Sequence, residues 1–357
     1  MTKKSRRRIK HSPKTVRLDL TTRKFITKTV VQAIKMISQK NHRLIEASRD
    51  HPQISGFVEH KQIRILMVSF MTGDTLWQIE QMIAEQLRLL AKELVAIKAF
   101  QSFSSALHQL NPDLLLVVGN EEPLSGSDLD AIRAASVKKA IWLSDGPATS
   151  VATAELALLF DYVFTQNSLH IPFYQQSGCK SVFYLPFASN RSQFTPRSVD
   201  EAYRSDLLLL GDVSTSGKDY AESIKHVFPL RKVFACGSGW EHYPELTVLQ
   251  PDTELLPYYN GAEIIIHWGS LPNRMFDIAA CGAFQLAEAH PNIYEYMKPG
   301  EDIVTFHSAK ELLEKLHYYS NHAEAKRAVA SRSLWNSTYD YSFLQLTTKL
   351  LHIVFNR

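Results

Sequence analysis

The sequence has little cysteine and no long apolar run, and both absences narrow the function classes. Its 357 residues include three widely spaced cysteines, Cys179, Cys236 and Cys281, and no C-x-x-C pair. This odd number and spacing indicate neither a disulfide framework nor a zinc site. No stretch approaches the roughly 18 consecutive apolar residues of a membrane-spanning helix. Polar residues also follow the basic start where a signal peptide would have its apolar region. We therefore expect a protein that is cytoplasmic at synthesis.

The common nucleotide and metal motifs are also missing. Gly211–Lys218 follows an apolar run as a P-loop does, but five residues separate Gly211 from Gly217 instead of four, and Asp219 stands where a hydroxyl is needed. The CGSGW segment at 236–240 supplies only two glycines of a dinucleotide fingerprint. The 14 histidines form no H-E-x-x-H pattern. The sequence thus predicts neither an ATPase nor a nicotinamide enzyme, and we expect no metal site and no cofactor.

One acidic pair has metal-like spacing. Asp128 and Asp130 follow Ser125-Gly126-Ser127 and precede a helical pattern. Carboxylates in the first turn of a helix interact favourably with its positive end. We favour helix capping over a metal site for this pair.

The charge is distributed unevenly along the chain. The formal net charge is +4, but residues 1–50 carry 15 Lys and Arg against three acids, which leaves the other 307 residues net acidic. Residues 24–47 place apolar side chains at helical spacing among lysines, as in a basic amphipathic helix. Such a helix either attaches the protein to an anionic surface or packs on the body behind a basic tail.

Downstream, short apolar runs alternate with helical patterns, which is typical of βαβ units and parallel sheets. A polar segment at 190–204, with Pro196, interrupts the alternation. The sequence predicts two Rossmann-like α/β domains. Strands are expected at 64–70, 94–100, 113–119, 138–143, 161–165, 181–185, 207–211, 231–237, 246–249, 263–267 and 283–286. Helices are expected at 75–93, 103–110, 127–135, 218–227 and 272–281, and throughout 323–357. The expected division is an extension at 1–55, domains at 56–190 and 203–335, and a C-terminal helix at 336–357 that packs back on the first domain.

The segment 262–288 is the most informative. A strand is expected to end at His267, and a short loop then leads into a helix whose free N–H groups would face an anion. Arg274 and Asp277 are three residues apart and share a helix face. A guanidinium grips phosphate oxygens, and a carboxylate accepts hydrogen bonds from ribose hydroxyls. The alternative is an ordinary surface Arg–Asp pair.

Several segments resemble the CgeB/YkvP spore-maturation family of glycosyltransferase-like proteins. The residues from Arg274 to Leu286, RMFDIAACGAFQL, resemble the R-x-F-E helix, A-C-G turn and strand of that family. Further segments resemble the family in the expected order: WLSDGP at 142–147, DYVFTQN at 161–167, YLPFA at 184–188 and FACGSGW at 234–240. Residues 295–319 resemble the C-terminal half of group 1 glycosyltransferases. The resemblance covers about residues 60–357 and leaves the basic extension outside.

This resemblance implies a GT-B fold, in which two Rossmann-like domains face a cleft, and a nucleotide-sugar binds mainly to the C-terminal domain without an obligatory metal. It implies that Asp277 holds the ribose and Arg274 the diphosphate. Asp145 would be the catalytic general base, although a turn aspartate is an equal alternative. The implied substrate-binding residues are Gly73, Gly211, Gly237, Gly239, Ser270, Asn273, Arg274 and Asp277.

The sequence also departs from the family at three places. Asp277 stands where the family usually has Glu, Gly269 replaces the acid that many GT-B transferases carry eight residues earlier, and residues 337–342 lack the His and Arg of the late H-T-Y-x-x-R.

The leading hypothesis is a glycosyltransferase that acts on a glycan or polysaccharide, in spore-surface or cell-envelope maturation. It would bind a nucleotide-sugar and a glycan acceptor. Residues 1–47 would attach it peripherally to a membrane or spore surface. The alternative is a catalytically inactive GT-B scaffold held on an anionic surface by its basic N-terminus. Nucleic-acid binding is the weakest hypothesis, because no aromatic residues interleave with the basic ones in residues 1–22.

Overall fold

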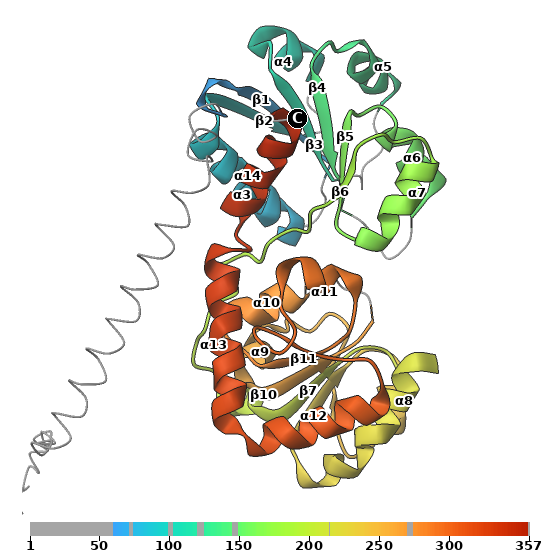
Figure 1. Ribbon diagram of the computed structural model, residues 1–357, viewed down its shortest axis with the longest axis vertical. Helices are drawn as coiled ribbons and strands as arrows, with labels where there is room; N and C mark the ends of the chain where they lie inside the picture. Colours follow the sequence, from blue (N-terminus) through green and yellow to red (C-terminus); the bar gives the residue numbers. More distant parts are fainter. Residues whose placement is uncertain are drawn as a thin grey trace, which may run out of the picture. The chain divides into compact units, whose positions relative to one another are not determined.

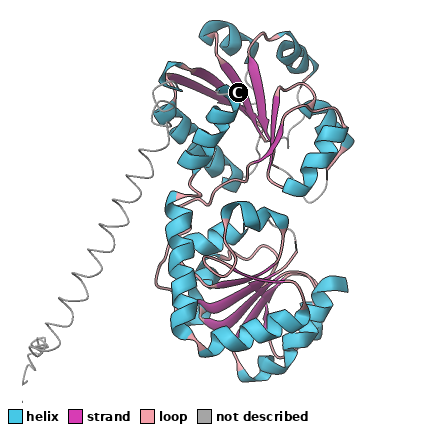
Figure 2. Ribbon diagram, viewed as in Figure 1, coloured by secondary structure: helices cyan, strands magenta, loops and turns pink. Residues whose placement is uncertain are grey.

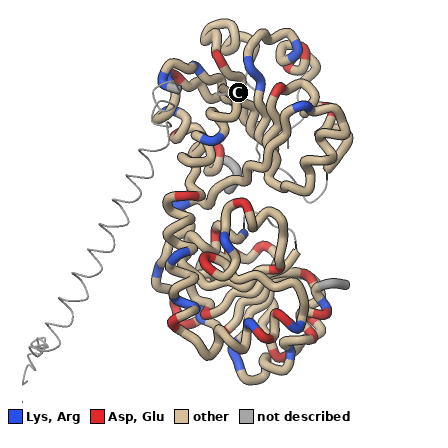
Figure 3. Tube along the Cα trace, in the orientation of Figure 1, with Lys and Arg blue, Asp and Glu red and all other residues tan. Residues whose placement is uncertain are grey.

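The chain divides into two units, Met1–Val58 and Glu59–Arg357, in a computed structural model. The structure describes parts of the second unit: residues 60–70, 74–98, 103–119, 125–144, 149–213, 215–269 and 274–355. The predicted basic helix at 24–47 and the attachment role of residues 1–47 lie outside the described residues. In the described part, Lys and Arg are interspersed with Asp and Glu (Figure 3).

The second unit is built on two six-stranded sheets, and every strand pair in both is parallel. The first sheet has the order β2-β1-β3-β4-β5-β6 (Figure 1). Its strands are β1 (Arg64–Ser69), β2 (Glu93–Lys98), β3 (Leu114–Val118), β4 (Lys138–Trp142), β5 (Tyr162–Thr165) and β6 (Val182–Tyr184). The buried run of β3 is apolar throughout because helices cover both faces of a parallel sheet.

The second sheet has the order β12-β11-β10-β7-β8-β9. Its strands are β7 (Ser205–Leu210), β8 (Val233–Cys236), β9 (Thr247–Val248), β10 (Ala262–His267), β11 (Gln285–Glu288) and β12 (Val304–Phe306). The strand order reverses between β7 and β10. In open α/β sheets, ligands collect beyond the carboxyl ends of the strands at such a switch point. We therefore expect a ligand of the second sheet to bind beyond the carboxyl ends of β7 and β10.

Helices alternate with the strands in both halves (Figure 2). The first half contains α3 (Asp74–Leu90), α4 (Phe103–Leu110), α5 (Gly126–Ala134), α6 (Val151–Ala157) and α7 (Ile171–Gln176). The second contains α8 (Thr215–Ile224), α9 (Leu256–Gly261), α10 (Arg274–Ala280), α11 (Pro291–Tyr296), α12 (Ala309–Asn321) and α13 (Ala323–Tyr339). Five of these helices are not among the helices that the sequence predicts: α6, α7, α9, α11 and α12.

The C-terminal stretch corrects one prediction. It is not helical throughout, because α13 ends at Tyr339 and α14 (Phe343–Phe355) begins after a break at 340–342. The break allows the chain to change partners. Helix α13 packs against α10 beside the second sheet, whereas α14 packs against α3. Its apolar face completes the first sheet's core, where Leu350 and Leu351 are fully buried.

None of the helices in the described part of the chain has the length and apolar character that crossing a bilayer requires.

Candidate functional site

Two buried tryptophans hold the loop that follows β7 at the switch point. Trp240 Nε1 donates to the carbonyl of Gly211 at 2.8 Å, and Trp268 Nε1 donates to the carbonyl of Asp212 at 2.9 Å. Asp212 Oδ1 in turn accepts from the backbone N–H of Ser238 at 2.7 Å. Buried indoles that have found acceptors are rigid aromatic anchors. The β7–α8 loop is therefore fixed before any ligand arrives.

The predicted glycines Gly211, Gly237 and Gly239 lie in the loops that follow β7 and β8. A Cβ on Gly237 would stand 2.3 Å from the carbonyl oxygen of Gly211, and one on Gly211 would stand 2.6 Å from Trp268 Nε1. Both glycines have positive φ, which disfavours any side chain. Gly239 also has positive φ and abuts Val213. The three glycines allow the loops after β7 and β8 to pack together, and their contact with a nucleotide stays a prediction.

Arg274 begins α10 and reaches the end of β7. Its Nη1 donates to the carbonyl of Leu210 at 3.1 Å. Burial lowers the pKa of the guanidinium, and Tyr259, Cys236 and Asp212 oppose this effect. Among the described residues, no carboxylate lies within the 4.0 Å of an ion pair with it. A partly buried cation thus stands at the switch point; no described carboxylate forms an ion pair with it, and the charge of Asp212 acts on it from further away.

Asp277 lies on the same short helix but faces a different environment. Burial raises the pKa of its carboxyl to about 7, and the nearby hydroxyl of Ser189 lowers it by less. The surface ion pair between Arg274 and Asp277, which was the alternative from the sequence, is not formed between these described residues. The two residues predicted to bind the diphosphate and the ribose, Arg274 and Asp277, thus lie on one helix but in different surroundings.

The sequence patterns missed three polar residues around this helix. His267 at the end of β10 and Gln285 on β11 share a hydrogen bond of 2.8 Å between Nε2 and Oε1. Glu288 ends β11 and accepts from the backbone N–H of Gly269 at 2.9 Å. Each contact joins residues 18 or 19 positions apart. Only the position of polar residues at strand ends could have indicated them.

Four predicted site residues lie outside the described residues: Gly73, Asp145, Ser270 and Asn273. Their roles stay predictions.

The capping prediction is confirmed for Asp128, which lies in the first turn of α5, but Asp130 lies beyond that turn. Ser125 is the N-cap of α5, and its side chain accepts from the backbone N–H of Asp128. Asp130 pairs with Arg133 at 2.9 Å. In the described ranges there is no group of three or more His, Cys, Asp or Glu that could hold a metal ion.

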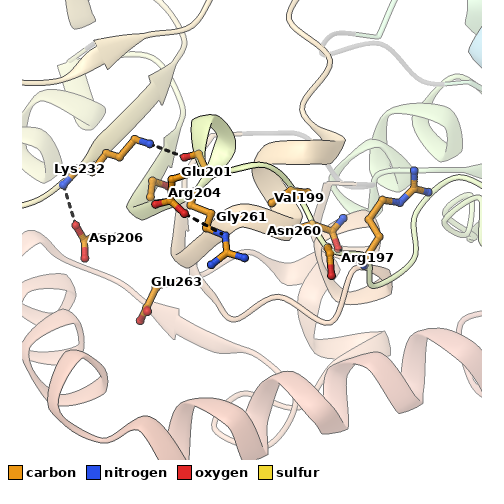
Figure 4. Close-up of a pocket in the computed structure, with 11 residues that line it drawn as sticks. Arg197, Val199, Glu201, Arg204, Asp206, Lys232, Asn260, Gly261 and Glu263 are labelled. Carbon is orange, nitrogen blue, oxygen red and sulfur yellow. Dashed lines mark hydrogen bonds and ion pairs between the residues drawn. The ribbon is translucent and has the colours of Figure 1, made fainter. Parts of the chain in front are cut away.

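Two cavities open on opposite edges of the second sheet. One, of about 590 Å³, lies at the amino ends of β7, β8 and β10, where Arg204, Lys232 and Glu263 line it (Figure 4). The other, of about 610 Å³, lies beyond the carboxyl ends and is lined by Gly239 and Lys218. Ligands of parallel sheets bind at carboxyl ends. The cavity in Figure 4 is therefore on the wrong edge for the predicted nucleotide site.

Several known proteins are similar to this chain in sequence or in fold. A family model described as glycosyl transferase-like matches residues 219–345. The spore protein CgeB of Bacillus subtilis (strain 168) is 27% identical over 310 residues, which cover 76% of this chain and 88% of CgeB. The chain is therefore similar to CgeB in sequence. The resemblance predicted from the sequence is confirmed.

Solved structures show the fold of this CgeB-like chain. HepE from Anabaena, in complex with UDP and glucose, has a TM-score of 0.55 at 11% identity, over 83% of this chain and 100% of HepE. A glycosyltransferase from Rickettsia africae ESF-5 has a TM-score of 0.59 at 10% identity, over 82% of this chain and 98% of its own. Together with the two parallel sheets, these neighbours show that the CgeB-like chain has the GT-B fold.

Proposed function

We propose that this chain is a glycosyltransferase that moves a sugar from a nucleotide-diphosphate-sugar to a glycan or polysaccharide acceptor. One observation carries the proposal. The guanidinium of Arg274 is partly buried at the switch point and hydrogen-bonded to the Leu210 carbonyl, and no described carboxylate forms an ion pair with it. Partial burial of a charge that forms no ion pair is unfavourable. A diphosphate would supply the missing anion, and a guanidinium binds phosphate oxygens in a bidentate way.

The proposed sugar transfer depends on the same guanidinium of Arg274. The acceptor hydroxyl forms a bond to the anomeric carbon while the bond from that carbon to the diphosphate breaks. Negative charge grows on the departing diphosphate, and a preorganised cation in a low-dielectric site stabilises it. We propose that Arg274 does this without a metal ion. The acceptor's proton goes to a carboxylate of the first domain, for which Asp145 stays the predicted residue.

The neighbours support a nucleotide-sugar donor. HepE structures contain UDP, UDP with glucose, or UDP-glucose. The name of CgeB, a spore protein, supports an acceptor in the spore surface or cell envelope. We extend both to this chain as part of the proposal, with peripheral attachment through residues 1–47.

The test is calorimetry and product analysis on the full chain with UDP-, GDP- and dTDP-sugars. We expect one donor class to bind and to release its nucleoside diphosphate slowly, even without an acceptor. Absence of binding by all three classes would contradict the proposal. Binding without release or transfer to any glycan would favour a GT-B scaffold, which Gly269 also favours because it stands where many transferases carry an acid.

Donor binding should depend on the ionisation of Asp277. Ribose hydroxyls donate to the ionised carboxylate, and the pKa of the free protein's carboxyl is about 7. Affinity for UDP-glucose should therefore rise by about tenfold per pH unit below that value and level off above it. UDP-glucose is the suitable probe because its diphosphate does not titrate near neutral pH. Calorimetry from pH 5 to pH 9 measures the profile.

The matched variant is Asp277→Asn, which should bind weakly with a flat profile across this range. It should also be more stable than wild type at pH 8, because a raised folded-state pKa removes stability as pH rises through about 4 to 7. The two proteins should converge near pH 4. A wild-type profile that falls with rising pH would mean that Asp277 binds as a neutral donor instead.

A further inference from the structure

Gln285 on β11 ties the end of β10 to the first turn of α10. Its side chain is fully buried, its Nε2 donates to the carbonyl of Met275 at 3.0 Å, and its Oε1 lies 2.8 Å from His267 Nε2. Burial, and then the charge of Arg274, lowers the pKa of His267 to about 3. The imidazole is therefore neutral near pH 7, and its Nε2–H donates to Gln285.

Glu288, three residues further along β11, ties down the other side of the same connection. Its Oε2 accepts from the backbone N–H of Gly269 at 2.9 Å, and its Oε1 accepts from the hydroxyl of Tyr220 at 2.8 Å. Tyr220 comes from α8, and its ring centroid is 5.7 Å from that of Trp268. One carboxylate thus links β11, α8 and the first residue after Trp268.

The two β11 side chains therefore hold the chain at 269 and at 275, and Arg274 lies between these two points. We propose that Glu288 is a positioning residue of the diphosphate site: it acts through Gly269 and Tyr220 and does not contact the ligand. This inference rests on the proposed function. Hydrogen bonds to a carboxylate are about twice as strong as neutral ones, so two of them fix the side chain closely. An enzyme site needs such support because small displacements of a charged group weaken binding.

Electrostatics argue that this acid is there for positioning. A carboxylate at the edge where an anion binds lowers the local positive potential and so opposes binding. An apolar residue at position 288 would pack in the sheet without this electrostatic cost. The gain that offsets it is the pair of hydrogen bonds to Gly269 and Tyr220, which no apolar side chain provides.

The experiment uses the full chain with three variants, Glu288→Ala, Glu288→Gln and Tyr220→Phe. Calorimetry with UDP and with inorganic pyrophosphate measures binding at 15 °C. Hydrogen exchange of residues 262–269, without ligand, measures how firmly Gly269 is held. Glu155→Gln is the matched control, because this glutamate is exposed and lies on α6, in the half of the chain that is built on the first sheet.

We expect Glu288→Ala to weaken UDP and pyrophosphate binding by about tenfold or more and to speed exchange at 262–269. Glu288→Gln keeps an oxygen for the Gly269 N–H and should rescue most of the affinity, to within about threefold. Tyr220→Phe should fall between them. The control should match wild type in every measurement.

Each other outcome has a distinct meaning. If wild type binds UDP and Glu288→Ala binds it equally well, the positioning role is wrong and the proposed function stands. A lower melting temperature with unchanged affinity would show a merely structural residue, which also overturns the inference. If wild type binds neither UDP nor pyrophosphate, the proposed function fails; exchange at 262–269 then decides separately whether Glu288 holds Gly269.

Discussion

Arg274→Met should abolish most nucleotide binding and make the free protein more stable. Methionine has a similar length but no charge, so it removes the group that we propose pairs with the diphosphate. The loss of a charged, desolvated interaction corresponds to about a hundredfold or more in UDP affinity. The free protein would gain about 1–3 kcal/mol in its free energy of unfolding, because burial of the guanidinium is no longer required. Leu210 keeps a partner, since its carbonyl also accepts from the backbone N–H of Trp268 at 3.1 Å.

Calorimetry with UDP measures the change in affinity. Urea denaturation measures the change in the free energy of unfolding. Arg204→Met is the matched control, because Arg204 is exposed and lines the cavity at the amino ends of the strands (Figure 4). It should change neither quantity measurably. Unchanged UDP affinity in a folded Arg274→Met protein would contradict the site itself, and an opposite stability change would show that the guanidinium has a stabilising partner.

The largest expected effect on stability is that of Asn292→Ala. Asn292, on α11, is 2% exposed. Its Oδ1 accepts from the backbone N–H and the hydroxyl of Ser168 at 2.8 and 2.6 Å, and its Nδ2 donates to Asn167 Oδ1 at 3.2 Å. Its backbone carbonyl accepts from the hydroxyl of Tyr184 at 3.2 Å. Truncation removes the side-chain contacts and leaves buried polar groups without partners, at about 1–3 kcal/mol each.

We therefore expect Asn292→Ala to lower the free energy of unfolding by about 3 kcal/mol in urea denaturation. Ser168→Ala removes one hydroxyl and should cost about 1 kcal/mol. The control is Asn321→Ala, an exposed asparagine whose amide bonds only to the carbonyl of His317 four residues earlier, and we expect little change. If Asn292→Ala were as mild as the control, water would be replacing the lost hydrogen bonds.

Every strand except β12, and most helices, could be predicted because their signal is local. The run of five apolar residues at 114–118 specifies a buried strand whatever surrounds it, and the helix at 103–110 follows from its own periodicity. Arg274 and Asp277 were also found locally, since a spacing of three places both on one helix face. The short helix α9 was missed because six residues are too few for a periodic pattern.

The environments of Arg274 and Asp277 could be found only from the tertiary structure. The distinction between a surface ion pair and two partly buried groups in separate surroundings depends on Leu210 and Ser189, which lie 64 and 88 positions before their partners. The helical prediction for 323–357 was wrong at 340–342, because the chain leaves one core for another there and periodicity does not show which core a helix joins.

The sequence by itself predicted a two-domain α/β chain without a cysteine framework or a long apolar run. Its motifs showed the resemblance to the CgeB/YkvP family. Those properties depend on residue type and short spacing, which folding does not change. Only the tertiary structure decided that Arg274 is desolvated, that the Asp277 carboxyl has a pKa of about 7, and that Glu288 holds Gly269. Burial and hydrogen bonding are properties of distant residues brought together, so no local pattern contains them.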